Sequence, residues 1–202
     1  MDQPYVIGID IGGTNTIFGI VDKRGQILRS GAIKTGRHED VGDYLDELAK
    51  ALNDLLKDSF TKDTIKGIGV GAPNGNYFSG SIEFAPNLPW KGVIPFAKML
   101  EERIGIPVAL TNDANAAAIG EMTYGAARGM KDFIEITLGT GVGSGIVVNG
   151  QLVYGHDGFA GELGHVILRR NNGRLCGCGR SGCLEAYTSA TGVARTAREI
   201  LD

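Results

Sequence analysis

Three cysteines lie close together near the end of the sequence, at Cys176, Cys178 and Cys183. Their number is odd and no export signal precedes them, which favours a metal site over disulfides. A tetrahedral structural zinc needs a fourth ligand, and His165, a short distance before Cys176, is the best candidate. The alternative is three reduced, buried thiols. Four protein ligands would leave no open coordination position, so a catalytic zinc is not expected.

Two glycine-rich turns, Asp10-Ile-Gly-Gly-Thr-Asn15 and Leu138-Gly-Thr-Gly-Val-Gly143, each follow an apolar, strand-like run. Such turns let backbone N–H groups approach an anion closely, so two turns that converge would bind a polyphosphate such as a nucleotide. Asp10 would repel bare phosphate, and we expect it to hold Mg²⁺ through water; an Asx turn is the alternative. The expected phosphate-binding residues are Gly12, Gly13, Thr14, Asn15, Gly139, Thr140 and Gly141.

Other nucleotide-binding motifs are not supported by the sequence. No G-x-x-x-x-G-K-[ST] motif occurs, and the glycines of residues 67–72 run into Pro73-Asn74-Gly75 instead of a helix. We therefore exclude both a P-loop and a Rossmann site.

The elements that must position these turns follow from hydrophobic periodicity and breaker residues. Strands are predicted at residues 5–10, 16–21, 26–34, 65–70 and 107–110. Helices are predicted at residues 40–58, at 95–104 with a proline in the first turn and a glycine stop, and at 114–122 with Asp113 as its N-cap.

An internal repeat indicates two related domains. Residues 133–153 repeat the strand, glycine turn, strand, turn, strand pattern of residues 6–28. We place the first domain at residues 1–114 and the second at residues 115–202.

Composition excludes several classes of partner. Glycine accounts for 32 of 202 residues, far above its usual share, which indicates many tight turns. The net charge of −3 supplies no broad positive field for nucleic acid or an anionic membrane. With neither a signal peptide nor a membrane span in view, we expect a cytoplasmic protein.

Two further motifs are Asn112-Asp-Ala-Asn-Ala-Ala-Ala118 and Gly161-Glu-Leu-Gly-His165. Together with the two glycine turns and the cysteine motif, they resemble the ROK family of sugar kinases and sugar-sensing repressors, and bacterial glucokinases most closely. The resemblance covers essentially the whole chain. It implies an α/β, actin-like (ribonuclease-H-like) fold of two domains with the sugar in the cleft between them. It also implies His165 as the fourth zinc ligand.

The resemblance assigns roles to individual residues. Phosphoryl transfer to a sugar hydroxyl needs a carboxylate to accept its proton, and Asp113 is the expected catalytic base, a role compatible with a helix cap. A hexose needs amides and carboxylates that make paired hydrogen bonds. The sugar-binding residues implied by the resemblance are Asn87, Asn112, Asp113, Glu162, His165 and Glu185, with Gly75 and Asn76 less secure. For Asn87 a loop asparagine that bonds its own backbone is the alternative, and for Glu162 and Glu185 solvated surface charges.

The expected function is ATP-dependent phosphorylation of a hexose, with glucose converted to glucose 6-phosphate. N-acetylmannosamine, fructose or another hexose is an alternative substrate, and a non-catalytic sugar-binding or sugar-sensing module is an alternative function. The first strand begins near Tyr5, which leaves no room for a preceding DNA-reading domain. Family members are about half as long again, so we expect an incomplete second domain, little activity of these 202 residues alone, and a homodimer in the full-length protein.

Overall fold

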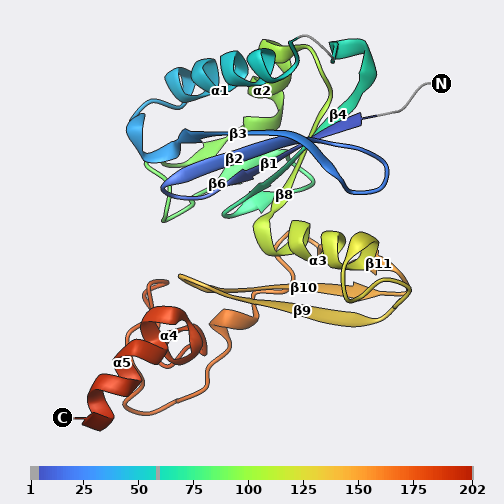
Figure 1. The fold of residues 1–202 in the computed structure, drawn as a ribbon. Helices are drawn as coiled ribbons and strands as arrows, with labels where there is room; N and C mark the ends of the chain where they lie inside the picture. Colours follow the sequence, from blue (N-terminus) through green and yellow to red (C-terminus); the bar gives the residue numbers. More distant parts are fainter. Residues whose placement is uncertain (1–4, 58–59, 202) are drawn as a thin grey trace. The chain divides into compact units, whose positions relative to one another are not determined.

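The computed structural model describes residues 5–57 and 60–201 (Figure 1). The chain divides into two compact units, Met1–Ala116 and Ala117–Asp202, and each is described here by itself.

A five-stranded mixed sheet with the order β3-β2-β1-β4-β8 forms the first unit (Figure 1). The strands β1 (Tyr5–Ile11), β2 (Asn15–Val21) and β3 (Ile27–Lys34) pair antiparallel. On the other side of β1, β4 (Ile65–Ala72) and β8 (Val108–Asn112) add in parallel. Three antiparallel strands followed by two parallel strands is the topology that a ribonuclease-H-like domain requires.

Helices connect the parallel strands, as the geometry of a parallel pair demands. The helix α1 (Val41–Leu55) begins after Asp40, whose carboxylate accepts hydrogen bonds from the N–H groups of Gly42 and Asp43. It ends at Leu55, earlier than predicted, and residue 58 of the prediction lies outside the described residues. The short 3₁₀ turns η1 (Thr35–Arg37) and η2 (Lys62–Thr64) precede and follow it.

The helix α2 (Phe96–Ile104) ends where the sequence predicted. Gly105 adopts a left-handed conformation with φ of 69°, which a side chain would disfavour. Pro95 lies just before the helix and not in its first turn.

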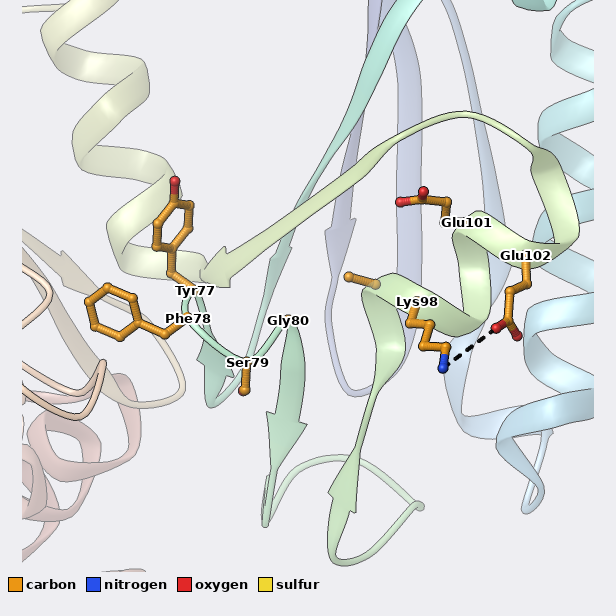
Figure 2. A pocket seen from close by; sticks show the side chains of 8 residues that line it. Tyr77, Phe78, Ser79, Gly80, Lys98, Glu101 and Glu102 are labelled. Atoms are coloured by element: carbon orange, nitrogen blue, oxygen red, sulfur yellow. Dashed lines mark ion pairs between the residues drawn. The ribbon is translucent and has the colours of Figure 1, made fainter.

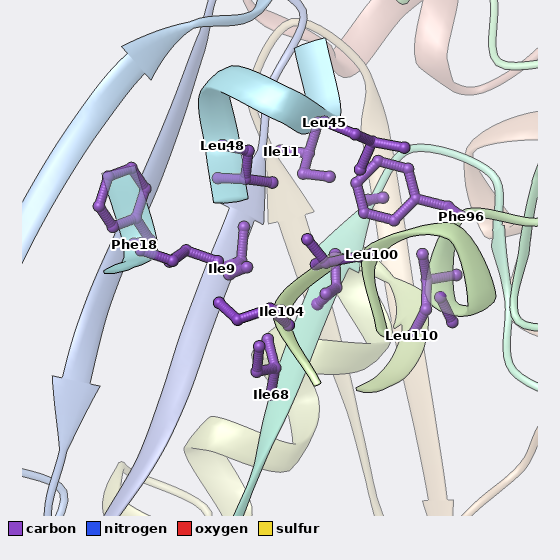
Figure 3. Packing of buried hydrophobic residues seen from close by; sticks show 14 of the residues in the cluster. Ile9, Ile11, Phe18, Leu45, Leu48, Ile68, Phe96, Leu100, Ile104 and Leu110 are labelled. Atoms are coloured by element: carbon purple, nitrogen blue, oxygen red, sulfur yellow. The ribbon is translucent and has the colours of Figure 1, made fainter. Parts of the chain in front are cut away.

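The core of the first unit lies between this sheet and its two helices (Figure 3). Ile9, Ile11 and Phe18 from the sheet meet Leu45 from α1 and Leu100 from α2. These side chains are almost fully buried, so the apolar face of each element is explained by burial against its neighbours.

A small antiparallel sheet, β5 (Gly75–Asn76), β6 (Ser81–Glu83) and β7 (Val93–Ile94), also belongs to the first unit. The sequence predicted only a turn at Asn74-Gly75. Asn74 does have a positive φ of 52°, as a turn residue would, but strands this short leave no periodic signal.

The helix α3 (Asp113–Tyr124) spans the boundary of the two units. It begins one residue earlier than predicted, so Asp113 is its first residue and not its N-cap. The N–H of Ala114 donates both to the amide oxygen of Asn112 at 2.9 Å and to the carboxylate of Asp113 at 2.8 Å, and of these two residues Asn112 is the one that precedes the helix, in the N-cap position.

The second unit contains the strands that the internal repeat predicted. β9 (Phe133–Leu138), β10 (Val142–Val148) and β11 (Gln151–Leu152) form an antiparallel sheet in the order β11-β10-β9. This order matches β3-β2-β1 of the first unit. A 3₁₀ turn η3 (Leu163–His165) and two helices, α4 (Glu185–Thr188) and α5 (Ala190–Leu201), complete the unit.

One face of β9 remains open to solvent. Ile134, Ile136 and Leu138 alternate along the strand and are 55%, 52% and 66% exposed. None of the helices in the described part of the chain combines the length and apolar character that a bilayer span requires.

Candidate functional site

Two carboxylates lie near one edge of the first sheet. Asp10 on β1, Gly71 on β4 and Thr111 on β8 follow one another across three neighbouring strands. A Cβ atom on Gly71 would lie 3.6 Å from the Cα atom of Asp113 and 3.2 Å from the Cβ atom of Ala116. The start of α3 therefore packs against Gly71, and the missing side chain lets Asp113 approach the sheet edge that carries Asp10.

The electrostatics reflect this proximity. Partial burial, and then the negative charge of Asp113, raise the pKa of Asp10 above its usual value. Both side chains remain accessible to solvent. A divalent cation at this edge would relieve the repulsion between the two carboxylates, so the donor set fits a hard cation with oxygen ligands.

The first glycine turn joins β1 to β2 and is closed by the N–H of Gly12, which donates to the carbonyl oxygen of Asn15 at 3.0 Å. The N–H of Thr35 donates to the carbonyl oxygen of Thr14, which joins the turn to the segment after β3. The ammonium group of Lys34 donates to the Asn15 side chain at 2.8 Å. Lys34 thus brings a positive charge to a turn predicted to bind phosphate. The sequence analysis missed it because the β2–β3 register, which pairs Asn15 with Lys34, cannot be read from spacing alone.

Asn87 lies against the same turn. A Cβ atom on Gly13 would lie 2.6 Å from the carbonyl oxygen of Asn87, so only glycine fits there. The Asn87 side chain is exposed and makes no hydrogen bond with a described residue. It is therefore not engaged in closing its own loop.

Gly75 and Asn76 have structural contacts. Asn76 is buried, and its side-chain oxygen accepts hydrogen bonds from the N–H groups of Phe78 and Ser79. A Cβ atom on Gly75 would lie 2.4 Å from the carbonyl oxygen of Thr111. Both residues thus shape the loop beside the end of β8.

A hollow of about 500 Å³ lies in the first unit, and neither Asp10 nor Asp113 lines it (Figure 2). Tyr77 and Phe78 lie on one side, and Lys98, Glu101 and Glu102 of α2 on the other. None of the residues predicted to bind sugar or phosphate lines it, so the candidate site is placed by its carboxylates and glycine turns and not by this hollow.

In the second unit, the structure brings together the four residues predicted to bind metal. One ligand atom from each of His165, Cys176, Cys178 and Cys183 lies within 4.8 Å of the other three. The cysteines are free thiols. The Sγ atoms of Cys178 and Cys183 are 3.7 Å apart, and Nδ1 of His165 is 3.7 Å from Sγ of Cys176. Tetrahedral zinc with its usual bond lengths would place such atoms ~3.5–3.8 Å apart, so the donor set and spacing fit zinc.

Backbone hydrogen bonds between residues close in sequence shape the loop that carries the thiols. The N–H of Cys176 donates to the carbonyl oxygen of Arg180, and the N–H of Gly179 donates back to that of Cys176. Gly182 has a positive φ of 87°, and a Cβ atom there would lie 1.8 Å from the carbonyl oxygen of Arg169. Gly182 is therefore required by this tight path, whereas nothing lies within 4 Å of a Cβ atom on Gly177.

The thiols differ in their ionisation. Burial raises the pKa of Cys176 to about 12, whereas a hydrogen bond from the Arg180 backbone lowers the pKa of Cys178 to about 6. Of these two sulfurs, Cys178 is therefore the one more readily present as the thiolate that a metal requires.

Glu162 and Glu185 lie on either side of this cluster. Oε2 of Glu162 is 4.0 Å from Nε2 of His165, the ring nitrogen opposite the one that faces Cys176. Oε1 of Glu185 is 3.5 Å from Sγ of Cys176, and its Oε2 accepts a hydrogen bond from the N–H of Val142 at 3.0 Å. Both glutamates therefore lie close to the cluster, and Glu162 is also exposed to solvent.

The second glycine turn joins β9 to β10. The N–H of Gly139 donates to the carbonyl oxygen of Gly141, and the N–H of Ala190 donates to that of Gly139. Gly139 and Thr140 are exposed. The turn therefore lies open on one side and is held by the start of α5 on the other.

The family model described as "ROK family" matches residues 6–202 of this sequence. The chain belongs to the ROK family. The glucokinase of Halalkalibacterium halodurans is 40% identical over 201 residues, which cover 98% of this chain and 61% of that protein. A putative xylose repressor of a Caldicellulosiruptor species is 37% identical over 91% of this chain and 46% of its own length.

Among solved structures, a ROK family glucokinase from Streptomyces griseus in complex with glucose and AMPPNP superposes with a TM-score of 0.82 at 37% identity. The match covers 96% of this chain and 60% of that one. The ROK chain described here thus has the mixed α/β, actin-like fold and spans about three fifths of the length of the glucokinases it matches.

Proposed function

We propose that this ROK chain carries the catalytic base, the sugar-binding residues and both phosphate-binding turns of an ATP-dependent hexose kinase that converts glucose to glucose 6-phosphate. The observation that carries the proposal is the placement of Asp113 near Asp10, at the sheet edge that continues into the first glycine turn. Relatives described as glucokinases, one of them bound to glucose and a nucleotide, support this choice of substrates.

In the proposed reaction, the Asp113 carboxylate accepts the proton of the sugar hydroxyl. The hydroxyl oxygen attacks the γ-phosphorus of ATP, the bond from that phosphorus to the β,γ-bridging oxygen breaks, and ADP leaves. Asp113 suits the role of base because its side chain is exposed at the start of α3, where Asn112 caps the helix. Asp10 would hold Mg²⁺ through water, and the bound ion would supply positive charge to the phosphates.

The sugar-binding role extends to residues of both units. Asn87 has an exposed amide with no partner in the described chain, and it lies against Gly13. The other proposed sugar-binding residues are Asn112, Glu162, His165 and Glu185. Gly75 and Asn76 would shape the loop beside the end of β8, because the Asn76 side-chain oxygen is already used by the backbone.

We also propose that His165, Cys176, Cys178 and Cys183 bind one structural zinc ion. The ion would cross-link a loop that otherwise contains short turns and isolated β-bridges, and it would fix the ring of His165 between Cys176 and Glu162. Glu162 and Glu185 are adjacent to this cluster, so the metal would set the position of two proposed sugar ligands.

Another hexose, such as N-acetylmannosamine or fructose, is the alternative substrate. A sugar-sensing regulator is the alternative function, and the similarity to a xylose repressor supports it. Titration calorimetry of this chain with a panel of hexoses tests sugar binding. A coupled ADP-release assay on a chain that also contains the remaining length of the relatives tests turnover.

Glucose-dependent ADP release, lost in Asp113→Asn, is the expected result. Sugar binding without ADP release from the longer chain would favour the regulator. For residues 1–202 alone we expect weak or no turnover, and robust turnover would contradict that expectation.

A further inference from the structure

The carboxylate of Glu185 lies between two parts of the second unit that are far apart in sequence. Its Oε2 atom accepts a hydrogen bond from the N–H of Val142 at 3.0 Å, at the end of the second glycine turn. Its Oε1 atom lies 3.5 Å from Sγ of Cys176, in the His/Cys cluster. One side chain therefore joins the turn to the cluster.

The turn is shaped to receive this carboxylate. A Cβ atom on Gly141 would lie 2.7 Å from Oε2 of Glu185, so a side chain at this position would displace the carboxylate. Gly164, next to His165 of the cluster, also packs closely against Val142. A Cβ atom on Gly164 would lie 2.3 Å from the carbonyl oxygen of Val142. Gly164, next to His165, therefore packs on the carbonyl group of Val142, and Glu185, two residues after Cys183, accepts its N–H.

The hydrogen bonds of the second glycine turn show how the contact between Glu185 and Val142 affects the neighbouring N–H groups. The N–H groups of Gly139 and Val142 are engaged, by Gly141 and Glu185 respectively. Those of Thr140 and Gly141 make no hydrogen bond with a described residue. By fixing Val142, Glu185 leaves two neighbouring N–H groups with their donor capacity unused, which is what a phosphate oxygen requires.

The cluster in turn fixes Glu185. It lies two residues after Cys183, and the N–H of Leu184 donates to the carbonyl oxygen of Val166, the residue after His165. Any displacement of His165 or Cys183 must therefore move Glu185 with respect to Val142. A carboxylate has about four acceptor positions, so this role is compatible with a bond to a sugar hydroxyl.

We propose that Glu185 is a positioning residue that ties the second glycine turn to the His/Cys cluster, so that metal in the cluster holds the turn in its phosphate-accepting conformation. The coupling between the cluster and the turn does not depend on the proposed kinase function. Only the role of the turn in binding the phosphates of ATP rests on that function.

Amide hydrogen exchange of the 202-residue chain, followed residue by residue by NMR, tests the proposal in the zinc-loaded protein. In Glu185→Ala, the Val142 amide should exchange on the order of 10-fold faster or more, because its charged acceptor is gone. Glu185→Gln keeps an acceptor oxygen and should restore most of the protection. Asp132→Ala is the matched control: Asp132 accepts the N–H of Asn149 at the other end of the sheet, so this variant should speed exchange of the Asn149 amide and leave that of Val142 unchanged.

A second measurement removes the metal from the unaltered chain with a chelator. Exchange at Val142 should accelerate as it does in Glu185→Ala, while Asn149 keeps its protection. The proposal is overturned if Val142 exchange in Glu185→Ala stays within about twofold of the unaltered chain, or if emptying the cluster leaves Val142 unchanged. Calorimetry with glucose on the same samples reports the proposed function separately, since loss of sugar binding without a change at Val142 would leave Glu185 a sugar ligand only.

Discussion

Burial, and then the negative charge of Asp113, raise the pKa of Asp10, although the two aspartates belong to different elements, one at the start of α3 and the other on β1. Gly71 on the strand between them makes this possible, because its missing side chain lets α3 approach the sheet. The same arrangement suits a base beside a site for a divalent cation.

Asp113→Asn should abolish most of the proposed phosphoryl transfer and leave the fold intact. The amide keeps the shape of the side chain but cannot accept a proton, so turnover should fall by roughly 10²–10⁴-fold with sugar affinity largely retained. Steady-state kinetics and calorimetry on the longer chain measure both.

The matched control for that variant is Asp43→Asn. Asp43 is likewise an exposed aspartate in the first turn of a helix, α1, and it has no proposed role in catalysis. Turnover of the control should equal that of the unaltered protein. Near-normal turnover in Asp113→Asn would remove this residue from the mechanism.

Asp10→Asn should make the chain more stable at neutral pH while weakening nucleotide binding. The folded state holds the Asp10 proton more tightly than the unfolded state, because its pKa is raised by burial and by Asp113. The resulting stabilisation is present below the unfolded pKa and is lost as the pH rises through the folded value. Ionised Asp10 therefore destabilises the folded chain at neutral pH, and a neutral amide avoids that penalty.

Urea unfolding between about pH 4 and about pH 7 measures this effect. The stability advantage of the Asp10→Asn variant should be largest at the upper end and shrink toward the lower end. An advantage independent of pH would show that the ionisation of Asp10 is not its cause.

Much of this architecture could be predicted from the sequence because its signals are local. The β1–β2–β3 and β9–β10–β11 repeats show alternation around glycine turns, and the cysteine spacing by itself brings three thiols together. The side-chain contacts of Lys34 and Glu185 could not be predicted in this way, because they depend on strand register and on loop packing. The helix cap was assigned to Asp113 instead of Asn112 because adjacent Asn and Asp residues are equally good caps.

Gly13→Ala should displace the Asn87 loop from the first glycine turn. A Cβ atom at position 13 would lie 2.6 Å from the Asn87 carbonyl oxygen, and backbone cannot move aside as a flexible side chain can. We expect a loss of about 1–3 kcal/mol in the free energy of unfolding, together with weaker hexose binding. Gly8→Ala is the control, because nothing lies within 4 Å of a Cβ atom there. Equal losses in the two variants would contradict the close packing of Gly13 on Asn87.

Protein purified without chelator should contain about one zinc ion per chain, and removing that ion should disorder the loop of residues 165–185, loosen the second glycine turn that Glu185 contacts, and leave the first unit unchanged. The loop is held by short turns and four converging ligands, so without metal it should become sensitive to protease and exchange its amides quickly. Cys183→Ser, which replaces a fully buried ligand, should give the same result in untreated protein.

The single tryptophan supplies an internal control for the zinc experiment. Trp90 is 5% exposed in the core of the first unit, and its indole N–H donates to the carbonyl oxygen of His38. Its fluorescence should stay constant while the metal is removed, because the first unit has its own core. Zinc-free protein with a protected loop would show that the cluster folds without metal, and a parallel shift of Trp90 emission would show that the ion stabilises the whole chain.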